Sequence, residues 1–234
     1  MIRVESTDEP DSFDDCVRTL GNEWLSIIRG NGITEFELLK FPDHWLDVRA
    51  ELKSVFKNRC GYSATIVPGP GEVDHYIAKT SSPDQAYEWS NYRFSSSDIN
   101  KKKGTHNDKI LDPFKIHNGW LRMNEASFEI EITKNMPFAF HEQAQFTLDK
   151  LGINNDNSII TRLTAAANAL SNPGNQALLD QVAQDYPMVA DAISHIWSNS
   201  NIDKDALALT LRELFWKHRI LVVNEFVLQG LSRV

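Results

Sequence analysis

A change of pattern after Asn58 is the feature that most constrains the fold. Before it, apolar residues recur at steps of three and four, which is typical of one face of an amphipathic helix. From Cys60 to Trp120 the chain instead carries glycines, prolines, short β-prone runs and polar turns. From about Pro137 the helical spacing returns. The pattern predicts an α+β protein, mostly α-helical overall, in which an irregular module is embedded between helical segments.

The helical segments can be outlined from their apolar residues and their stop signals. A first helix is expected to end at Gly30-Asn31-Gly32, and a second to begin at about Asp43. Residues 1–11 are expected to be poorly ordered. Later helices are predicted to end at Gly152, at residues 172–174 and before Pro187. A last apolar segment carries Leu207, Leu211, Leu214, Phe215 and Leu221, which we expect to be mainly core and alternatively a partner surface.

The irregular module carries several short structure signals. Residues 68–71 (PGPG) form a turn signal between residues 63–67 and 72–77, so a hairpin of these two runs is predicted. Residues 92–95 are predicted to form another strand, and residues 98–103 a helix that Gly104 ends. We therefore divide the chain into an N-terminal helical segment, residues 1–58, the module, residues 59–120, and a C-terminal helical region, residues 121–234, packed on the module.

Composition and known motifs exclude several classes of protein. The chain has 234 residues, of which 41% are hydrophobic, so it is long enough to bury a core. It has no apolar run of the ~18 residues that a membrane helix needs, and no signal or transit peptide is expected, so we expect a cytoplasmic protein. The nucleophile-elbow, P-loop and dinucleotide-binding motifs are absent, and Gln145 breaks the zinc-protease motif that begins at His141.

The charge of the chain is unevenly distributed. The net charge is −8, which argues against general nucleic-acid binding. Residues 93–116, however, carry a net charge of +3, which leaves −11 for the rest. A basic segment on an acidic protein is compatible with a phosphate-binding site. A solvated run of lysines on a surface turn is the alternative. The basic residues of the segment are Arg93, Lys101, Lys102, Lys103, Lys109 and Lys115.

One group of residues within the module carries chemistry. It consists of residues 72–76 (EVDHY), 89–93 (WSNYR) and 98–104 (DINKKKG). Taken singly, a histidine, a turn asparagine and an asparagine near a helix end each have an ordinary structural explanation. The combination of an acid-histidine pair with two asparagines in this order carries more weight than its members.

With these segments the sequence resembles the HNH endonucleases, whose site is a ββα-metal fold. Many bacterial members have, in order, Cys-x-Tyr, an acid-His pair with a Pro/Ala-Lys turn, Tyr-x-Trp-x-Asn and Asn-x-x-Lys-Gly. The corresponding segments here are residues 60–62, 74–79, 87–91 and 100–104. Residues 111–113 (LDP) and 151–154 (LGIN) further resemble the nuclease subunit of Septu-type bacterial defence systems. The core of the resemblance covers about 60 of the 234 residues.

The resemblance implies a role for each residue of the group. Asp74 and Asn100 would hold Mg²⁺ or Mn²⁺, and His75, whose ordinary pKa is about 6.5, would act as general base. Asn91 would hold the His75 ring. Asp74 and His75 alternate along a strand, so they can serve one phosphate if the strand ends or twists there. The cationic side chains that would contact nucleic-acid phosphates are Arg93, Lys101, Lys102 and Lys103.

The resemblance also implies what the module lacks. Many relatives have two CxxC pairs that bind a structural zinc, whereas this chain has two cysteines, Cys16 and Cys60, and no CxxC pair. Ser63, Ser96 and Ile99 stand where other zinc ligands would lie. We therefore expect no structural zinc. A module of about 60 residues has a marginal core, so the flanking helices are expected to stabilise it.

Three functions are consistent with these residues. The first is a metal-dependent DNA endonuclease in anti-phage defence or restriction, whose partner is an ATPase subunit or a second copy of the chain. The second is a catalytically decayed HNH-like subunit that serves in binding or assembly, which the missing cysteines and the acidic surface favour. The third is an RNA-directed toxin nuclease with the same site. No membrane partner is expected.

Overall fold

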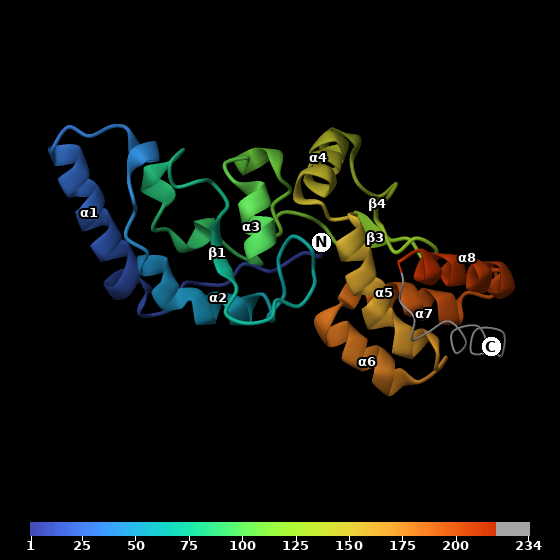
Figure 1. Cartoon of the computed structure of the whole chain (residues 1–234). Helices are drawn as coiled ribbons and strands as arrows, with labels where there is room; N and C mark the ends of the chain where they lie inside the picture. The colour runs from blue at the N-terminus through green and yellow to red at the C-terminus, as the bar shows by residue number, and fades with distance from the viewer. Residues whose placement is uncertain (219–234) are drawn as a thin grey trace. The chain divides into compact units, whose positions relative to one another are not determined.

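The computed structural model describes residues 1–218, which divide into two compact units, Met1–His117 and a second that begins at Asn118 (Figure 1). The expected boundaries lay after residues 58 and 120. Residues 1–58 instead belong to the same compact unit as the module, and the chain divides after His117. Each unit is described by itself, and the packing of the C-terminal region on the module stays a prediction. In the described part, no helix is both long and apolar enough to span a bilayer.

The first unit begins with the two predicted helical segments. A π-helical turn, Asp14–Arg18, leads into α1, Thr19–Gly30, which ends at the predicted glycine. Two short 3-10 turns follow, Phe36–Leu38 and His44–Val48, and the second leads into α2, Arg49–Val55. The apolar spacing of the sequence therefore predicted both helices, although it did not separate their π-helical and 3-10 turns from the α-helical parts.

The module folds as two strands followed by a helix. The strands β1, Glu72–His75, and β2, Tyr92–Ser95, pair antiparallel, with Asp74 opposite Arg93 and His75 opposite Tyr92. After Ser96 comes α3, Ser97–Lys103, which Gly104 ends with a positive φ of 53°. The bounds of β2 and the end of α3 are those predicted. The strand β1 ends at His75, as the sequence required if Asp74 and His75 are to share one site.

The predicted hairpin between residues 63–67 and 72–77 is wrong. The partner of β1 is β2, and residues near 63–67 form one isolated bridge, between Arg59 and Ile66. The reason is a tight turn: the Ala64 amide donates to the Cys60 carbonyl, and the Cys60 amide donates to the Thr65 carbonyl, each over 2.9 Å. Residues 60–65 thus fold back on themselves, and the Gly61 amide donates to the Phe94 carbonyl of β2 over 2.9 Å, so they do not pair with β1 as a hairpin.

The N-terminal residues are anchored, which corrects the expectation of poor order. The Val4 amide donates to the Pro113 carbonyl over 2.9 Å, and the Trp89 indole N–H donates to the Thr7 carbonyl over 3.0 Å. Met1 is buried. These residues have no regular secondary structure, and their order comes from partners about 80 to 110 positions away in the chain, which local sequence patterns do not show.

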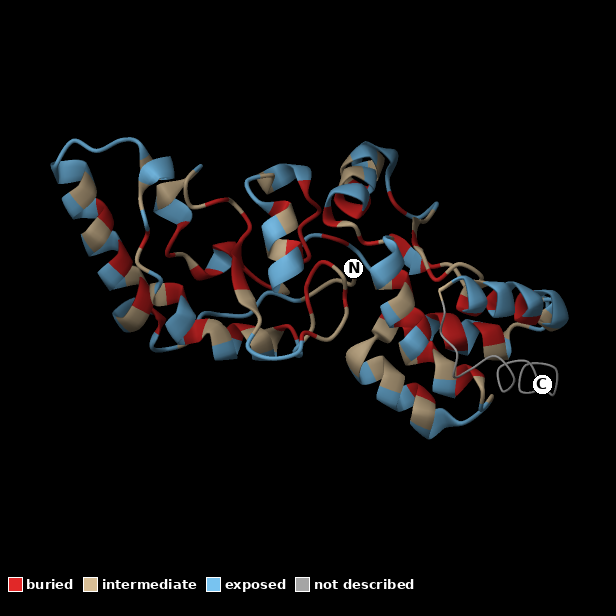
Figure 2. Cartoon of the chain, viewed as in Figure 1, coloured by how far each residue is buried: buried red, intermediate tan, exposed pale blue. Residues whose placement is uncertain are grey.

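The N-terminal helices and the module share one aromatic core. Phe13 packs edge-on against Trp89 and Tyr92, with ring centroids 5.8 and 6.0 Å apart. A Cβ at Gly21 of α1 would lie 2.1 Å from the Tyr87 ring, so only glycine permits this close approach. All of β2 is buried. Its partner β1, which Figure 1 labels, is also mostly buried (Figure 2). Burial of a large side chain stabilises a fold by about 1.5–3 kcal/mol, so Phe13, which precedes α1, contributes to the stability of the module.

The second unit combines a small sheet with five described helices. The strands β3, Leu121–Met123, and β4, Ile130–Ile132, pair antiparallel and were not predicted. The helices follow the predicted breaks at Gly152 and Pro187. They are α4, His141–Leu151, α5, Asp156–Leu170, α6, Gln176–Asp185, α7, Pro187–Ser198, and α8, Lys204–Lys217.

Buried polar groups hold the second unit together. The Arg162 guanidinium is buried and donates to the Phe128 carbonyl over 2.9 Å and to the Ile153 carbonyl over 2.6 Å. The Asn154 side chain, from one of the Septu-like motifs, accepts from the Ile130 amide and donates to its carbonyl. In α8, Leu207, Leu211 and Phe215 are buried and Leu214 is half-buried, so this part of the apolar segment lies in the core of the second unit, whereas Leu221 lies outside the described residues.

Candidate catalytic site

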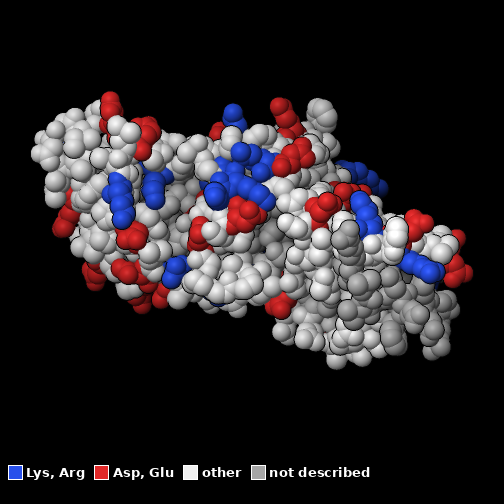
Figure 3. Space-filling view, viewed as in Figure 1, with Lys and Arg blue, Asp and Glu red and all other residues white. Residues whose placement is uncertain are grey.

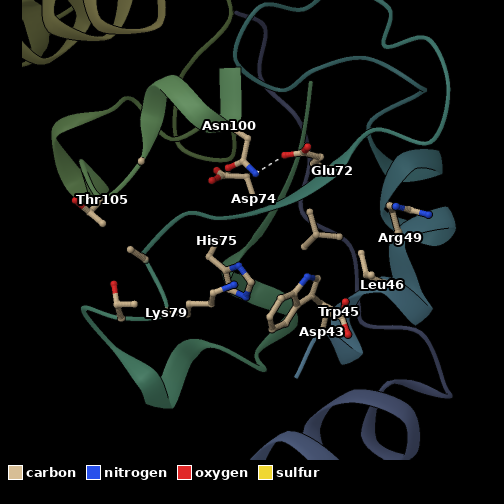
Figure 4. A pocket seen from close by; sticks show the side chains of 14 residues that line it. Asp43, Trp45, Leu46, Arg49, Glu72, Asp74, His75, Lys79, Asn100 and Thr105 are labelled. Carbon is tan, nitrogen blue, oxygen red and sulfur yellow. Dashed lines mark hydrogen bonds between the residues drawn. The ribbon is translucent and has the colours of Figure 1, made fainter. Parts of the chain in front are cut away.

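Three of the eight predicted site residues, Asp74, His75 and Asn100, line one cavity of about 550 Å³ in the first unit (Figure 4). The end of β1 contributes Glu72, Asp74 and His75, and α3 contributes Asn100. The opposite wall comes from the 3-10 turn His44–Val48, the residue before it and the start of α2. Its lining residues are Asp43, Trp45, Leu46 and Arg49, and the turn after β1 adds Lys79.

His75 is held as a neutral ring with a defined tautomer. Its Nε2 lies 2.9 Å from the Ala86 carbonyl, which can only accept, so Nε2 carries the proton and Nδ1 keeps the lone pair. Burial and the nearby Lys79 ammonium lower the pKa of His75 to about 3. The ring is therefore uncharged at neutral pH, with Nδ1 unprotonated.

Two aromatic rings fix the orientation of the His75 imidazole. Trp45 meets it edge-on at a centroid distance of 4.7 Å, and Tyr92 does so at 5.2 Å. The Tyr92 hydroxyl donates over 2.9 Å to the same Ala86 carbonyl that binds His75. The ring thus has little freedom to rotate, which is what a positioned proton acceptor requires.

Asn91 secures the loop between the two strands. Its side-chain oxygen accepts from the Ile77 amide over 2.7 Å, and its Nδ2 donates to the carbonyls of Ile77 and Gln85 over 2.9 and 3.0 Å. Gln85 directly precedes Ala86, which binds His75. The structure therefore places Asn91 next to the support of the imidazole, through the loop backbone, and its side-chain hydrogen bonds go to that backbone.

The Asp74 carboxylate is buried and has a partner on each oxygen. The Tyr62 hydroxyl donates to Oδ2 over 2.5 Å, and the Lys103 ammonium donates to Oδ1 over 3.0 Å. Lys103 also donates to the His75 carbonyl over 2.8 Å. Burial raises the pKa of Asp74, whereas the Lys103 charge and the Tyr62 hydrogen bond oppose that rise. The ammonium thus compensates a carboxylate that is only 2% exposed.

Asn100 pairs with an acid that the sequence reasoning did not assign. Its Nδ2 donates to Glu72 Oε2 over 2.7 Å (Figure 4). Because the nitrogen of the amide makes this hydrogen bond, the amide oxygen of Asn100 can still accept from or bind another group. Glu72 and Asp74 stand two positions apart on β1, so they lie on the same face of the strand. That period of two was the signal in the sequence that could have identified Glu72.

The donor chemistry of this face suits a hard cation such as Mg²⁺. Mg²⁺ is commonly held by one or two carboxylates, with water and substrate phosphate completing its shell. Asp74 and Glu72 supply carboxylates, and Asn100 supplies an amide oxygen. Among residues 1–218, no three His, Cys, Asp or Glu side chains gather as a metal-binding group. A cation here would therefore depend on the amide oxygen and on oxygens from water or substrate.

Arg93 does not occupy a position from which it could contact a phosphate, which corrects its predicted role. Its Nε and Nη2 donate to the two carboxylate oxygens of Asp112 over 2.7 and 2.8 Å. Its Nη1 donates to the carbonyls of Ser90 and Tyr92, and the guanidinium lies 3.8 Å from the Phe114 ring centroid. Arg93 is 4% exposed, so this cation ties β2 to the chain that follows α3.

The three consecutive lysines of α3 differ in their surroundings. Lys103 is fully buried against Asp74, so it is no surface contact for nucleic acid, and its predicted phosphate role is corrected. Lys102 pairs with Asp98 over 2.6 Å at the surface, and Lys101 is exposed. Lys and Arg side chains gather over α3 in Figure 3. Lys101 and Lys102 are the members of the predicted run that remain accessible.

The positions at which the resemblance to HNH endonucleases would place zinc ligands carry other contacts here. The Cys60 thiol is buried 3.6 Å from the Ser95 hydroxyl, and the Ser63 hydroxyl lies 2.7 Å from that of Thr65. The Ser96 side chain caps α3 by accepting from the Ile99 amide. Each residue that stands at such a position therefore has a partner within the fold.

Sequence reasoning missed the residues that reach the site from other elements. Trp45 contacts His75 from 30 positions away in the chain, and no local pattern marks such a contact. Tyr62 and Lys79 stood inside the quoted motifs without a role. No family model, no curated protein and no solved structure matches this chain, so its own geometry is what bears on function.

Proposed function

We propose that this protein is a metal-dependent endonuclease that hydrolyses phosphodiester bonds of DNA. The observation that carries the proposal is the tautomer of His75: Nε2 binds the Ala86 carbonyl, and Nδ1 keeps its lone pair in a residue that lines the cavity. Asp74 and Asn100 line the same cavity. A base and oxygen ligands at one place are what phosphodiester hydrolysis requires.

Each side chain of the site has its own role in the proposed reaction. His75 accepts a proton at Nδ1 from the attacking water, and Trp45 and Tyr92 keep the ring in place. Asp74 and Asn100 would hold Mg²⁺ or Mn²⁺, and Glu72 orients the Asn100 amide. When bound, the metal ion stabilises charge on the phosphate and on the leaving oxygen. Asn91 positions the loop that carries the Ala86 carbonyl.

The resemblance to Septu-type nucleases suggests a cellular role for the proposed endonuclease. It supports anti-phage defence or restriction as the role, with an ATPase subunit or a second copy of the chain as partner. RNA is the alternative substrate, because the residues named here would contact only the phosphate and sugar backbone, which carries no base sequence.

A second candidate function has one observation in its favour. Both oxygens of Asp74 already have partners, Tyr62 and Lys103, and the Lys103 ammonium supplies a positive charge beside the carboxylate. A site that no longer binds metal would be stable in this form. The second candidate is therefore a catalytically decayed subunit that serves in binding or assembly.

Nicking of a supercoiled plasmid decides between the two functions. The wild type is incubated with Mg²⁺, with Mn²⁺ or with EDTA, beside His75→Ala and the matched variant His117→Ala at an exposed position of the same unit. The endonuclease proposal expects metal-dependent nicking that His75→Ala lowers roughly 10²–10⁴-fold, whereas His117→Ala cuts like the wild type. Equal cutting by His75→Ala would remove His75 from the mechanism. Absence of nicking with either metal, on DNA and on RNA, favours the decayed subunit.

A further inference from the structure

The cavity has a second wall that the two strands and α3 do not supply. Trp45 of this wall lies edge-on against His75, and Leu46 and Arg49 continue it along the start of α2. The acid on this wall is Asp43, and the acids on the opposite wall are Glu72 and Asp74. A substrate that reaches Nδ1 of His75 therefore passes between two protein walls, and its phosphates need cationic partners there.

Lys79 provides such a cation beside His75. Its ammonium lies 4.2 Å from the Trp45 ring centroid and 5.8 Å from that of Phe41. The aromatic faces hold the ammonium in place, an interaction worth about 0.5–2 kcal/mol, and leave N–H donors for another acceptor. Among the described residues no carboxylate forms an ion pair with Lys79. Asp43 is the acid that interacts electrostatically with the Lys79 ammonium from a greater distance.

Arg49 provides a second cation in the same cavity. It is half-buried at the start of α2, and it has no ion pair with a carboxylate in the part of the chain that the structure describes. In Figure 4, Lys79 and Arg49 lie on opposite sides of Trp45. By contrast, Arg93 and Lys103 form ion pairs with the buried carboxylates of Asp112 and Asp74.

We propose that Lys79 and Arg49 bind phosphates of the nucleic-acid strand that enters this cavity, on either side of Trp45. The inference rests on the proposed function for the identity of the phosphate. Lys79, next to His75, contacts the phosphate at the reacting position, and Arg49 contacts a neighbouring one. Because such contacts position the strand without reading bases, binding at this site is independent of sequence.

Binding is measured separately from cleavage. The probe is a fluorescein-labelled single-stranded oligonucleotide in EDTA, with its duplex as a second arm, and anisotropy gives the dissociation constant at several salt concentrations. The proteins are full-length His75→Ala and the same chain with Lys79→Gln, Lys79→Arg or Arg49→Gln. Lys115→Gln is the matched control, since it removes one positive charge at an exposed position outside the cavity.

Lys79→Gln and Arg49→Gln are each expected to weaken binding about 5- to 20-fold, because each loses a charged hydrogen bond. Each is also expected to lower the slope of log affinity against log salt by about 1. Lys79→Arg keeps the charge and is expected to bind within about 3-fold of its parent, and Lys115→Gln within about 2-fold. Thermal unfolding checks that each variant is folded. Binding by both Lys79→Gln and Arg49→Gln that equals binding by Lys115→Gln overturns the inference.

Cleavage by Lys79→Gln with His75 intact separates this inference from the proposed function. If the wild type cuts and Lys79→Gln both binds and cuts like it, the inference fails and the endonuclease stands. If the wild type does not cut on either substrate but binding depends on Lys79 and Arg49, the phosphate site stands in a binding subunit. Loss of both binding and cutting supports the two together.

Discussion

The Lys103 ammonium donates to Asp74 Oδ1 over 3.0 Å, and both side chains are buried. Lys103 ends α3 and Asp74 lies in β1, so the pair joins the helix to the strand at the site. Tyr62 holds the other oxygen of the carboxylate. The orientation of Asp74 is thus fixed by its partners before any ligand arrives.

Removal of Lys103 is expected to destabilise the metal-free protein. Lys103→Met leaves the Asp74 carboxylate buried without its counter-charge, and breaking a buried pair costs about 3–5 kcal/mol. Lys102→Met is the matched control on the same helix, because its pair with Asp98 is exposed to solvent and is worth at most about 1 kcal/mol. Urea unfolding at pH 7 in EDTA measures both. Equal stabilities for the two variants would contradict a compensating role for Lys103.

The same variant has a defined pH dependence. Burial already raises the pKa of Asp74, and Lys103 opposes that rise. Its removal raises the pKa of Asp74 further, so the folded variant binds a proton more readily than the unfolded chain does. Its free energy of unfolding therefore falls, relative to the wild type, as the pH rises from the ordinary pKa of aspartate through the raised value. The added substitution Asp74→Asn is expected to remove this pH dependence.

Arg93→Lys is expected to affect stability and not phosphate binding. Lysine cannot reproduce the two-pronged pairing with Asp112 or the stacking on Phe114, so we expect a loss of about 2–4 kcal/mol. Arg29→Lys, in an exposed pair with Asp84, is the control and is expected to change little. The salt slope of oligonucleotide binding should equal that of the wild type. A stable Arg93→Lys variant with a lower salt slope would return Arg93 to the nucleic-acid interface.

We predict that folding requires no structural zinc. The expected positions are occupied by Cys60, Ser63 and Ser96, which have partners within the fold. Metal analysis of the purified protein should find no stoichiometric zinc, and a chelator should leave the midpoint of thermal unfolding unchanged. Tightly bound zinc that is released only on unfolding would show the prediction to be wrong.

The isolated protein is predicted to be a weak nuclease that a partner activates. Affinity for nucleic acid scales with the phosphates neutralised, and of the run at residues 101–103 only Lys101 and Lys102 remain accessible on an acidic chain. A second DNA-binding subunit would raise the effective concentration. We expect the C-terminal helices to make the contact, since Leu209 and Trp216 of α8 are exposed. Light scattering and cleavage at low nanomolar concentration test this. A strict monomer that cuts efficiently alone would refute it.

Local patterns determined much of the secondary structure. Apolar spacing and glycine stops predicted that the first helix ends at residues 30–32, and the bounds of β2 and the end of α3 at Gly104 were those expected. These features depend on neighbours within a few positions, which a sequence shows directly. The pairing of strands does not depend on such near neighbours. The chain turns back at residues 60–65, and β1 pairs with a strand 17 to 23 positions away.

The residues of the candidate site also fall into two groups, those that the sequence could suggest and those that depend on the tertiary structure. The candidates Asp74, His75, Asn91 and Asn100 could be proposed from the sequence, because strand alternation and the motifs of the resemblance to HNH endonucleases are local. The end of β1 at His75 followed only from that resemblance, since the β-prone run extends to residue 77. The sequence could not show whether a cationic side chain faces solvent or a buried acid, since nothing in it distinguishes Arg93 and Lys103 from Lys101. Tertiary packing alone decided that Asp112 and Asp74 neutralise them, and that Trp45 closes the cavity over His75. The physical reason is that burial makes an unpaired charge costly, and its partner then comes from wherever the chain folds back.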